Sequence, residues 1–312
     1  MYTIASAMAC LIAVLFCQNR PDAVAKERSQ SPANRAVAPR LSPGQLKARA
    51  IAHKTIAVDT NSAAPFVALL GSVATNYIGG MEALRALPAT LSSNQVQTLR
   101  AVVSLPYNTS MPLSALEFNG IKNVAADILL QQPAFPAEFL ADLVVQQADP
   151  AQDEVWRDYC LQMLTSGYLN LSGRVESDPD APAARELALA TLKGASSAGG
   201  STWPGTALLG LNTILSSEPD AFPREELDSR ILAVLSDTSA SEAALITASR
   251  LAGMSHLASA RTALETLAKD SVSELVRAVA TKSLSELDIE ASTQGAKVTA
   301  VSNKAITLVT YP

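Results

Sequence analysis

Residues 263–287 read ALETLAKDSVSELVRAVATKSLSEL, and this stretch decides the fold class of the chain. Apolar residues recur in it at steps of three and four, both before and after a short polar break that begins at Asp270. Such spacing is typical of amphipathic helices, whose apolar residues share one face. The stretch therefore predicts a hairpin of two helices joined by a tight turn.

The same pattern occurs again upstream. Leu232–Leu235 followed by Asp237 corresponds to Leu264–Leu267 followed by Asp270, and Leu140–Val144 followed by Asp149 repeats the order earlier. Repeated helix pairs of this size are typical of α-solenoids, in which each pair buries its apolar face against its neighbours. We therefore predict an all-α fold: an α-solenoid of stacked antiparallel helix pairs, with a disordered N-terminal arm and a short non-helical C-terminal tail.

The best-preserved copy also resembles a known family. Asp270, Val276-Arg277 and Ala280 resemble the HEAT repeat and its short HEAT-like relatives, which include the phycobilisome-lyase type. In that family a turn Asp and an Arg of the second helix form a ladder between adjacent repeats. The resemblance implies that Asp270 with Arg277, and Asp149 with Arg157, form such a structural ladder. The copy at Asp237 interrupts the ladder, because Ala243-Ala244 stands in place of Val-Arg.

The ends of the chain differ from its middle. An apolar run from Ile4 to Cys17 is short for a membrane span, and the small residues Ala23-Val24-Ala25 follow it. This pattern predicts a signal peptide over 1–25 and an exported protein, periplasmic or extracellular, with an uncleaved membrane anchor as the alternative. We expect a basic, Pro-containing linker over 26–62, a helical repeat domain over 63–290 and a tail over 291–312 with one or two short strands or a frayed end.

Charge is divided unevenly along the chain. Residues 26–54 carry a net charge of +6, residues 1–25 are balanced, and 55–312 therefore carry −11 of the total of −5. An acidic body excludes nucleic acid as its partner and favours a protein or peptide of basic or mixed character. The basic arm could hold the protein on anionic lipid or polymer, so membrane contact is expected only through this arm or an uncleaved N-terminus.

Helical periodicity continues from Pro65 to Asp288. A glycine pair, Gly79-Gly80, is expected to end the first apolar helix, and Ser92 or Ser93 to cap a later one. Polar insertions are expected at 170–182 and 194–205. The predicted helices span 44–53, 66–77, 81–87, 93–105, 113–132, 137–147, 154–168, 183–193, 206–216, 225–235, 241–254, 259–268 and 273–287.

No motif for chemistry is evident. Cys160 lies on an apolar helical face and is expected to be a small buried residue. The acidic residues Glu176, Asp178 and Asp180 lack the regular order of a calcium loop, so a solvated loop is favoured. We expect no catalytic residue, no cofactor and no metal.

Three residues are candidates for binding a partner: Trp156, Arg157 and Trp203. Each has a structural alternative. Trp156 could pack between repeats, Arg157 could meet Asp149 or Asp153, and Trp203 could fold back over helix ends. Tyr159 is expected on the core-facing stripe of its helix with Val155 and Met163.

These patterns predict an exported, non-catalytic helical-repeat scaffold whose groove is lined by the second helix of each pair. Two alternatives stay open. One is an enzyme accessory of the HEAT-like lyase type, with a pocket that joins Glu154, Arg157 and Tyr159. The other is a structural cell-envelope component held by its basic arm.

Overall fold

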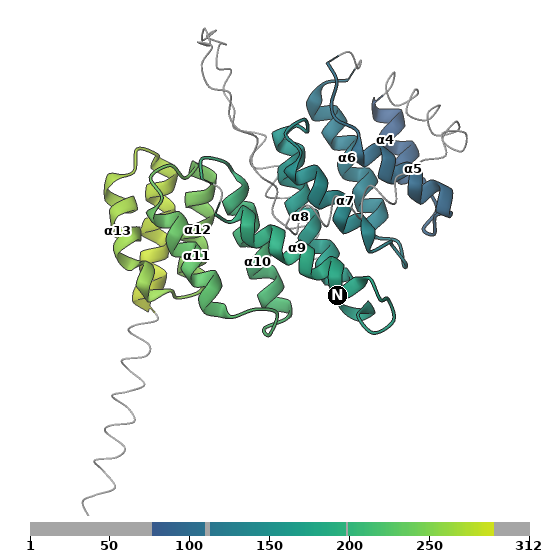
Figure 1. Cartoon of the computed structure of the whole chain (residues 1–312). Coiled ribbons are helices and arrows are strands. Elements are labelled where there is room, and N and C mark those ends of the chain that lie inside the picture. The colour runs from purple at the N-terminus through teal and green to yellow at the C-terminus, as the bar shows by residue number, and fades with distance from the viewer. Residues whose placement is uncertain (1–76, 110–112, 198, 290–312) are drawn as a thin grey trace, which may run out of the picture. The chain divides into compact units, whose positions relative to one another are not determined.

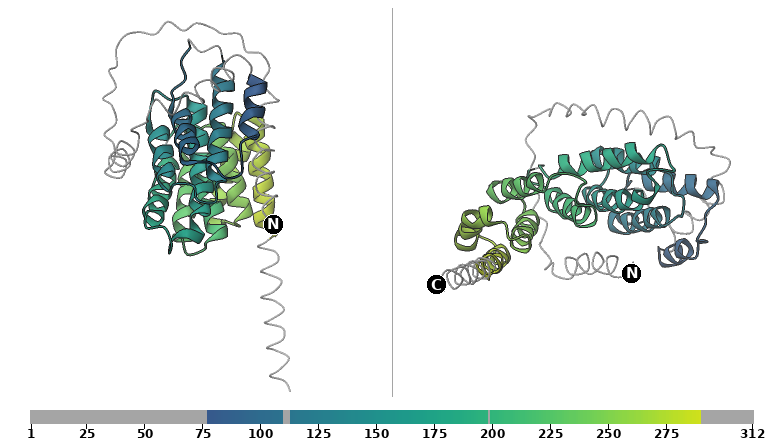
Figure 2. Two further views of the ribbon diagram at one scale, coloured as in Figure 1. Left: turned by 90° about the vertical axis from the view of Figure 1, so that its right-hand side faces the viewer. Right: turned by 90° about the horizontal axis from the view of Figure 1, so that it is seen from below.

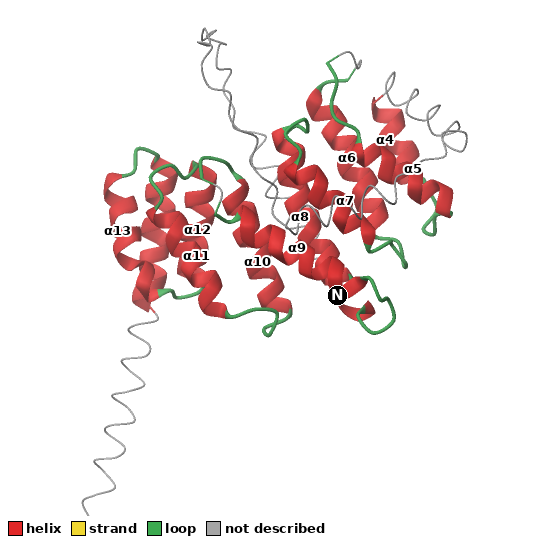
Figure 3. Ribbon diagram, viewed as in Figure 1, coloured by secondary structure: helices red, strands yellow, loops and turns green. Residues whose placement is uncertain are grey.

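The computed structural model describes residues 77–109, 113–197 and 199–289 of the chain. In these ranges every regular element is a helix, which confirms the all-α fold class (Figure 3). None of these helices combines the length with the apolar character that crossing a membrane requires. The expected signal peptide, linker, helix 44–53 and C-terminal tail lie outside the described residues, as does all but the last residue of the expected helix 66–77.

The described residues form ten α-helices from α4 to α13, which Figure 1 labels, and one more that follows them. Short 3-10 turns at Ser172–Arg174 and Ala258–Ala260 precede α9 and α13. The helices are α4 (Tyr77–Arg85), α5 (Ser93–Ser104), α6 (Ala115–Leu130), α7 (Glu138–Ala148), α8 (Glu154–Asn170), α9 (Ala181–Ala195), α10 (Trp203–Ser217), α11 (Arg224–Ser236), α12 (Glu242–Met254), α13 (Arg261–Asp270) and a final described helix over 274–289.

The helices pack as hairpins in chain order. Within hairpins, α5 contacts α6, α7 contacts α8, α9 contacts α10 and α11 contacts α12. Between hairpins, the second helices contact one another in the order α6, α8, α10, α12, while α5 contacts α7, α7 contacts α9 and α11 contacts α13. Consecutive hairpins therefore lie next to each other, as the colour sequence shows from three directions (Figures 1 and 2).

Side-chain caps explain where several helices begin. The Ser92 and Ser114 hydroxyls accept bonds from the amides of Gln95 and Glu117, whose side chains bond back to the serine amides. These capping boxes satisfy amides that have no partner within the helix. The Ser241 hydroxyl caps α12 by accepting a bond from the Ala244 amide, without a bond back. The predicted cap at Ser92 is confirmed.

The glycine pair does not end a helix. Gly79-Gly80 lies within α4, where the sequence predicted a stop. Met81 and Leu84 of the same helix are buried, and α4 contacts α6. Each glycine destabilises a helix by about 1 kcal/mol relative to alanine. The burial of Met81 and Leu84 stabilises α4 enough to offset this cost.

The core lies between the first and second helices of the hairpins. It is built mainly from Leu and Ala, with Trp156, Phe135 and Phe139 as its largest apolar side chains. Small residues let backbones approach closely: a Cβ placed on Gly205 of α10 would lie 3.1 Å from the Cα of Ala244 in α12.

Candidate functional site

The second helices of the hairpins begin along one edge of the domain. The Asn119 amide of α6 donates to the N-cap carboxylate of Asp153 before α8 at 2.6 Å. The hydroxyl of Ser241, the N-cap of α12, donates to the Ser201 carbonyl just before α10 at 2.7 Å. These bonds place the helix starts side by side. We call this region, with the turns that precede α6, α8, α10, α12 and the helix 274–289, the turn edge.

Asp158 joins α8 to α10 within the turn edge. Its carboxylate accepts a bond from the Thr206 hydroxyl at 2.8 Å and another from the Thr202 hydroxyl at 3.3 Å. Burial raises the pKa of Asp158, whereas its bonds to Thr206, Gln162 and Thr202 oppose the rise. A carboxylate held this way connects two helices and accepts protons more readily than an exposed aspartate.

Trp156 is fully buried, and its ring supports a buried lysine. The Lys122 ammonium lies 4.4 Å from the centre of the Trp156 ring. It also donates to the Leu105 carbonyl at 2.8 Å and to the Gln152 side-chain oxygen at 2.7 Å. Trp156 therefore packs between helices, which is the structural alternative, and presents no surface to a partner.

Burial also changes the proton affinity of the neighbouring groups. It lowers the pKa of Lys122 to about 7, although Cys160, Asp153 and Asp149 oppose the shift. It raises the pKa of the Cys160 thiol, which is fully buried. Cys160 is thus the small core residue that its apolar helical face predicted. Lys122 itself gave no signal in the sequence, because the partners of its ammonium lie 17 and 30 residues away.

Arg157 and Trp203 come together from different hairpins. The guanidinium of Arg157 in α8 lies 4.2 Å from the centre of the Trp203 ring at the start of α10. Its Nε also donates to the Gln147 carbonyl of α7 at 2.7 Å. Trp203 is half-buried and is the first residue of α10, whereas the sequence placed it in the insertion 194–205. The sequence singled out both residues but could not show that they contact each other.

The expected Asp–Arg ladder is not formed by direct ion pairs. Asp149 accepts the Ala151 amide at 2.9 Å, whereas Arg157 contacts the Gln147 carbonyl and Trp203. Arg277 likewise donates to the Ser271 carbonyl at 2.7 Å, and Asp270 is the exposed last residue of α13. Both arginines thus bond carbonyls at or just beyond the end of the preceding helix, which have no partner within that helix.

Other charged pairs connect successive first helices instead. Arg100 of α5 bonds Asp142 of α7 at 2.6 Å, and both side chains are buried. Burial raises the pKa of Asp142, and the bond to Arg100 opposes that rise. Arg100 and Asp142 lie 42 residues apart in the chain, so no local pattern in the sequence predicts that they pair.

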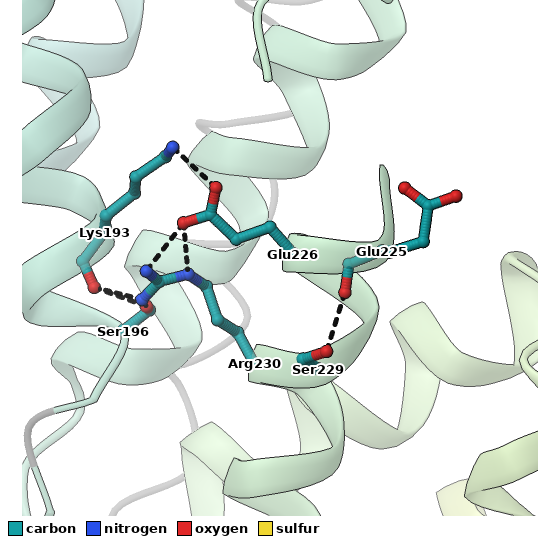
Figure 4. Close-up of polar contacts among 6 residues, drawn as sticks. All are labelled: Lys193, Ser196, Glu225, Glu226, Ser229 and Arg230. Atoms are coloured by element: carbon teal, nitrogen blue, oxygen red, sulfur yellow. Dashed lines mark hydrogen bonds and ion pairs between the residues drawn. The ribbon is translucent and has the colours of Figure 1, made fainter. Parts of the chain in front are cut away.

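Figure 4 shows the second connection, between α9 and α11. The Glu226 carboxylate lies between the Lys193 ammonium, at 2.7 Å, and the Arg230 guanidinium, at 2.8 Å. Arg230 also donates to the buried Ser196 hydroxyl at 2.8 Å. The neighbouring Glu225 carboxylate points away from this cluster, and only its carbonyl is engaged, by the Ser229 hydroxyl (Figure 4).

The turn edge exposes apolar side chains at corresponding helix positions. Leu116 in α6, Val155 in α8 and Leu275 in the helix 274–289 each occupy the second helical position, with exposed fractions of 66%, 47% and 51%. Val155 was expected in the core. The buried stripe of α8 instead runs through Trp156, Cys160 and Met163, and Tyr159 is partly exposed.

Acidic residues accompany these apolar side chains. Glu154, Glu242 and Glu274 are the first residues of their helices, are exposed, and make no side-chain bond among the described residues. A carboxylate in the first turn is favourable for the helix itself. An exposed leucine or valine beside it has no such role, so helix capping explains the acids but not the apolar row.

The acidic loop before α9 is held by local contacts. Arg174 bonds Asp178, donates to the Phe135 carbonyl at 2.7 Å and covers the Phe135 ring. Glu176 and Asp180 are exposed. No group of His, Cys, Asp and Glu side chains in the described parts of the chain is arranged to hold a metal ion.

The chain was also compared with known proteins. No protein-family model matches it, and neither a curated protein nor a solved structure gives a match.

Proposed function

We propose that this protein is a HEAT-like α-solenoid that acts as a scaffold without catalysis of its own and binds a protein or peptide partner. The observation that carries the proposal is the row of exposed apolar side chains at Leu116, Val155 and Leu275. Leu116 and Val155 occupy the same position of two second helices in contact, α6 and α8, and Leu275 occupies it in the helix 274–289. The corresponding residues of α10 and α12, Pro204 and Ala243, are buried and half-buried, so the row is interrupted there. Recurrence at one position is expected where a surface is assembled from repeats. Leu116 and Val155 lie on helices in contact, and exposed apolar side chains on adjacent helices are typical of interaction sites.

The packing supports a solenoid. Each hairpin contacts the next through both of its helices or through charged pairs, as Arg100–Asp142 and Lys193–Glu226 do. Neighbouring repeats in a solenoid stabilise one another in this nearest-neighbour manner. Export to the periplasm or the extracellular space is part of the same proposal, and it rests on the signal-peptide pattern of residues 1–25 alone.

Site-specific photo-crosslinking tests the proposal. A photoreactive amino acid would replace Val155 in the full-length chain, with a matched chain substituted at Met254, which is 57% exposed at the far end of α12. We expect a reproducible crosslink to one protein from position 155 that position 254 does not give. Equal crosslinking from both positions, or none from 155, would contradict a partner at the turn edge.

A further inference from the structure

The turn edge combines three chemical features along one line of helix starts. Apolar side chains are exposed at Leu116, Val155 and Leu275. Free carboxylates lie beside them at Glu154 and Glu274. The arginine side chains nearby, Arg157 and Arg277, direct their guanidinium groups to carbonyls of the protein itself. The edge is therefore both acidic and apolar.

The charges decide which kind of partner fits. Asp149, Asp153 and Glu154 surround the first turn of α8. A partner that carries acidic groups would bring like charges together, whereas lysine or arginine side chains would find unpaired carboxylates at Glu154 and Glu274. The apolar residues require matching apolar side chains, because otherwise their burial gains nothing.

The spacing of the helices decides the form of the partner. Helices in contact lie about 8–10 Å apart, and α6 contacts α8 directly. A peptide in the extended polyproline II conformation advances about 3.1 Å per residue and repeats its side-chain direction every three residues, so three of its residues span one helix interval on one face. A segment with an apolar residue at every third position could therefore place one side chain beside Leu116 and the next beside Val155.

We infer that the turn edge binds an extended basic segment of a partner protein, with apolar residues at every third position and lysine or arginine between them. The inference rests on the proposed function and specifies its partner. Apolar side chains of the segment pack on Leu116 and Val155. Its basic side chains pair with the carboxylates of the turn edge, Glu154 foremost.

Peptide binding to the full-length protein tests this directly. The probe is a fluorescent peptide of five valine–lysine–lysine repeats, compared with one in which glutamate replaces every lysine. We expect saturable binding of the basic peptide and at least tenfold weaker binding of the acidic one. Val155→Lys and Leu116→Lys should each weaken binding of the basic peptide at least fivefold, whereas Met254→Lys should leave it unchanged.

Several results would overturn the inference. Equal binding of both peptides, or equal loss in Met254→Lys and Val155→Lys, would show that attraction to the acidic body alone is responsible. Self-association in light scattering that Val155→Lys abolishes would identify a second copy of this chain as the occupant. Stronger peptide binding after replacement of the basic residues of 26–54 by glutamine would identify the protein's own arm. In each case a partner-specific photo-crosslink at position 155 would still support the scaffold function. Melting temperatures of all variants show whether they fold.

Discussion

At the scale of single residues, Lys122 is the most heavily constrained side chain near the turn edge. It is fully buried, and its ammonium connects the end of α5, through Leu105, to the turn before α8, through Gln152. The ring of Trp156 covers the same ammonium at 4.4 Å. Three helices thus depend on a residue that has no charged partner within ion-pair distance among the described residues.

Truncation of Lys122 should lower the stability of the protein. Lys122→Ala removes the apolar stem from the Trp156 ring and leaves the buried Gln152 oxygen and the partly buried Leu105 carbonyl without this donor, so we expect the free energy of unfolding to fall by about 3 kcal/mol. Lys122→Met keeps most of the stem and should cost less. Denaturant unfolding of both variants measures this. Equal stability of Lys122→Ala and the unsubstituted protein would contradict the buried position.

Lys122 also predicts a pH dependence. Burial lowers its pKa to about 7, while the unfolded chain retains a value near 10.5, so above pH 7 the unfolded state binds the extra proton. The contribution of Lys122 to stability therefore rises with pH between these values, by about 1.4 kcal/mol per pH unit, and is constant below pH 7. The stability of the protein relative to Lys122→Met, measured at pH 6 to 10, should follow this course. A difference that does not change with pH would contradict a lowered pKa.

At the scale of elements, helix starts were readable from the sequence and long-range contacts were not. The Ser92 cap was predicted because a cap depends on residues three positions apart, and the breaks between most helices followed the same local logic. The stop at Gly79-Gly80 was wrong because packing overrides propensity. Arg100–Asp142 and Arg157–Trp203 join different hairpins, so their contacts depend on how helices pack and not on local spacing.

The sequence did not predict correctly which face of α8 is buried. The sequence placed Val155 in the core, whereas Trp156 is buried and Val155 exposed. Successive helical residues point about 100° apart, so an error of one position moves the predicted buried face substantially. The sequence singled out Trp156, Arg157 and Trp203 as separate candidates, and only the packing shows what each of them contacts.

Close approach of helices gives a prediction at this scale. A Cβ at Gly253 of α12 would lie 2.9 Å from the Ser283 Cα of the final helix, which is closer than side-chain carbons normally come to backbone. Gly253→Ala should lower the free energy of unfolding by about 1–3 kcal/mol, because the two helices must separate.

Gly194 is the matched control, since a Cβ there meets nothing within 4 Å. Gly194→Ala in α9 should raise stability by about 0.5–1 kcal/mol through helix propensity alone. Thermal unfolding of both variants gives the comparison. A stabilised Gly253→Ala would show that α12 and the final helix are not in close contact.

At the scale of the whole molecule, the uneven distribution of charge along the chain and the carboxylates of the turn edge both favour a basic partner. Residues 55–312 carry −11, and the free carboxylates Glu154, Glu242 and Glu274 begin helices along one edge. Binding at this edge should accordingly weaken as salt increases.

Hydrogen exchange of the full-length protein, with and without the valine–lysine–lysine peptide, tests the turn edge as a binding surface most directly. We predict slower exchange in the presence of the peptide at the starts of α6 and α8, around Leu116 and Val155, and no change at the end of α12 near Met254. Protection at the end of α12, or spread evenly over the helices, would contradict it.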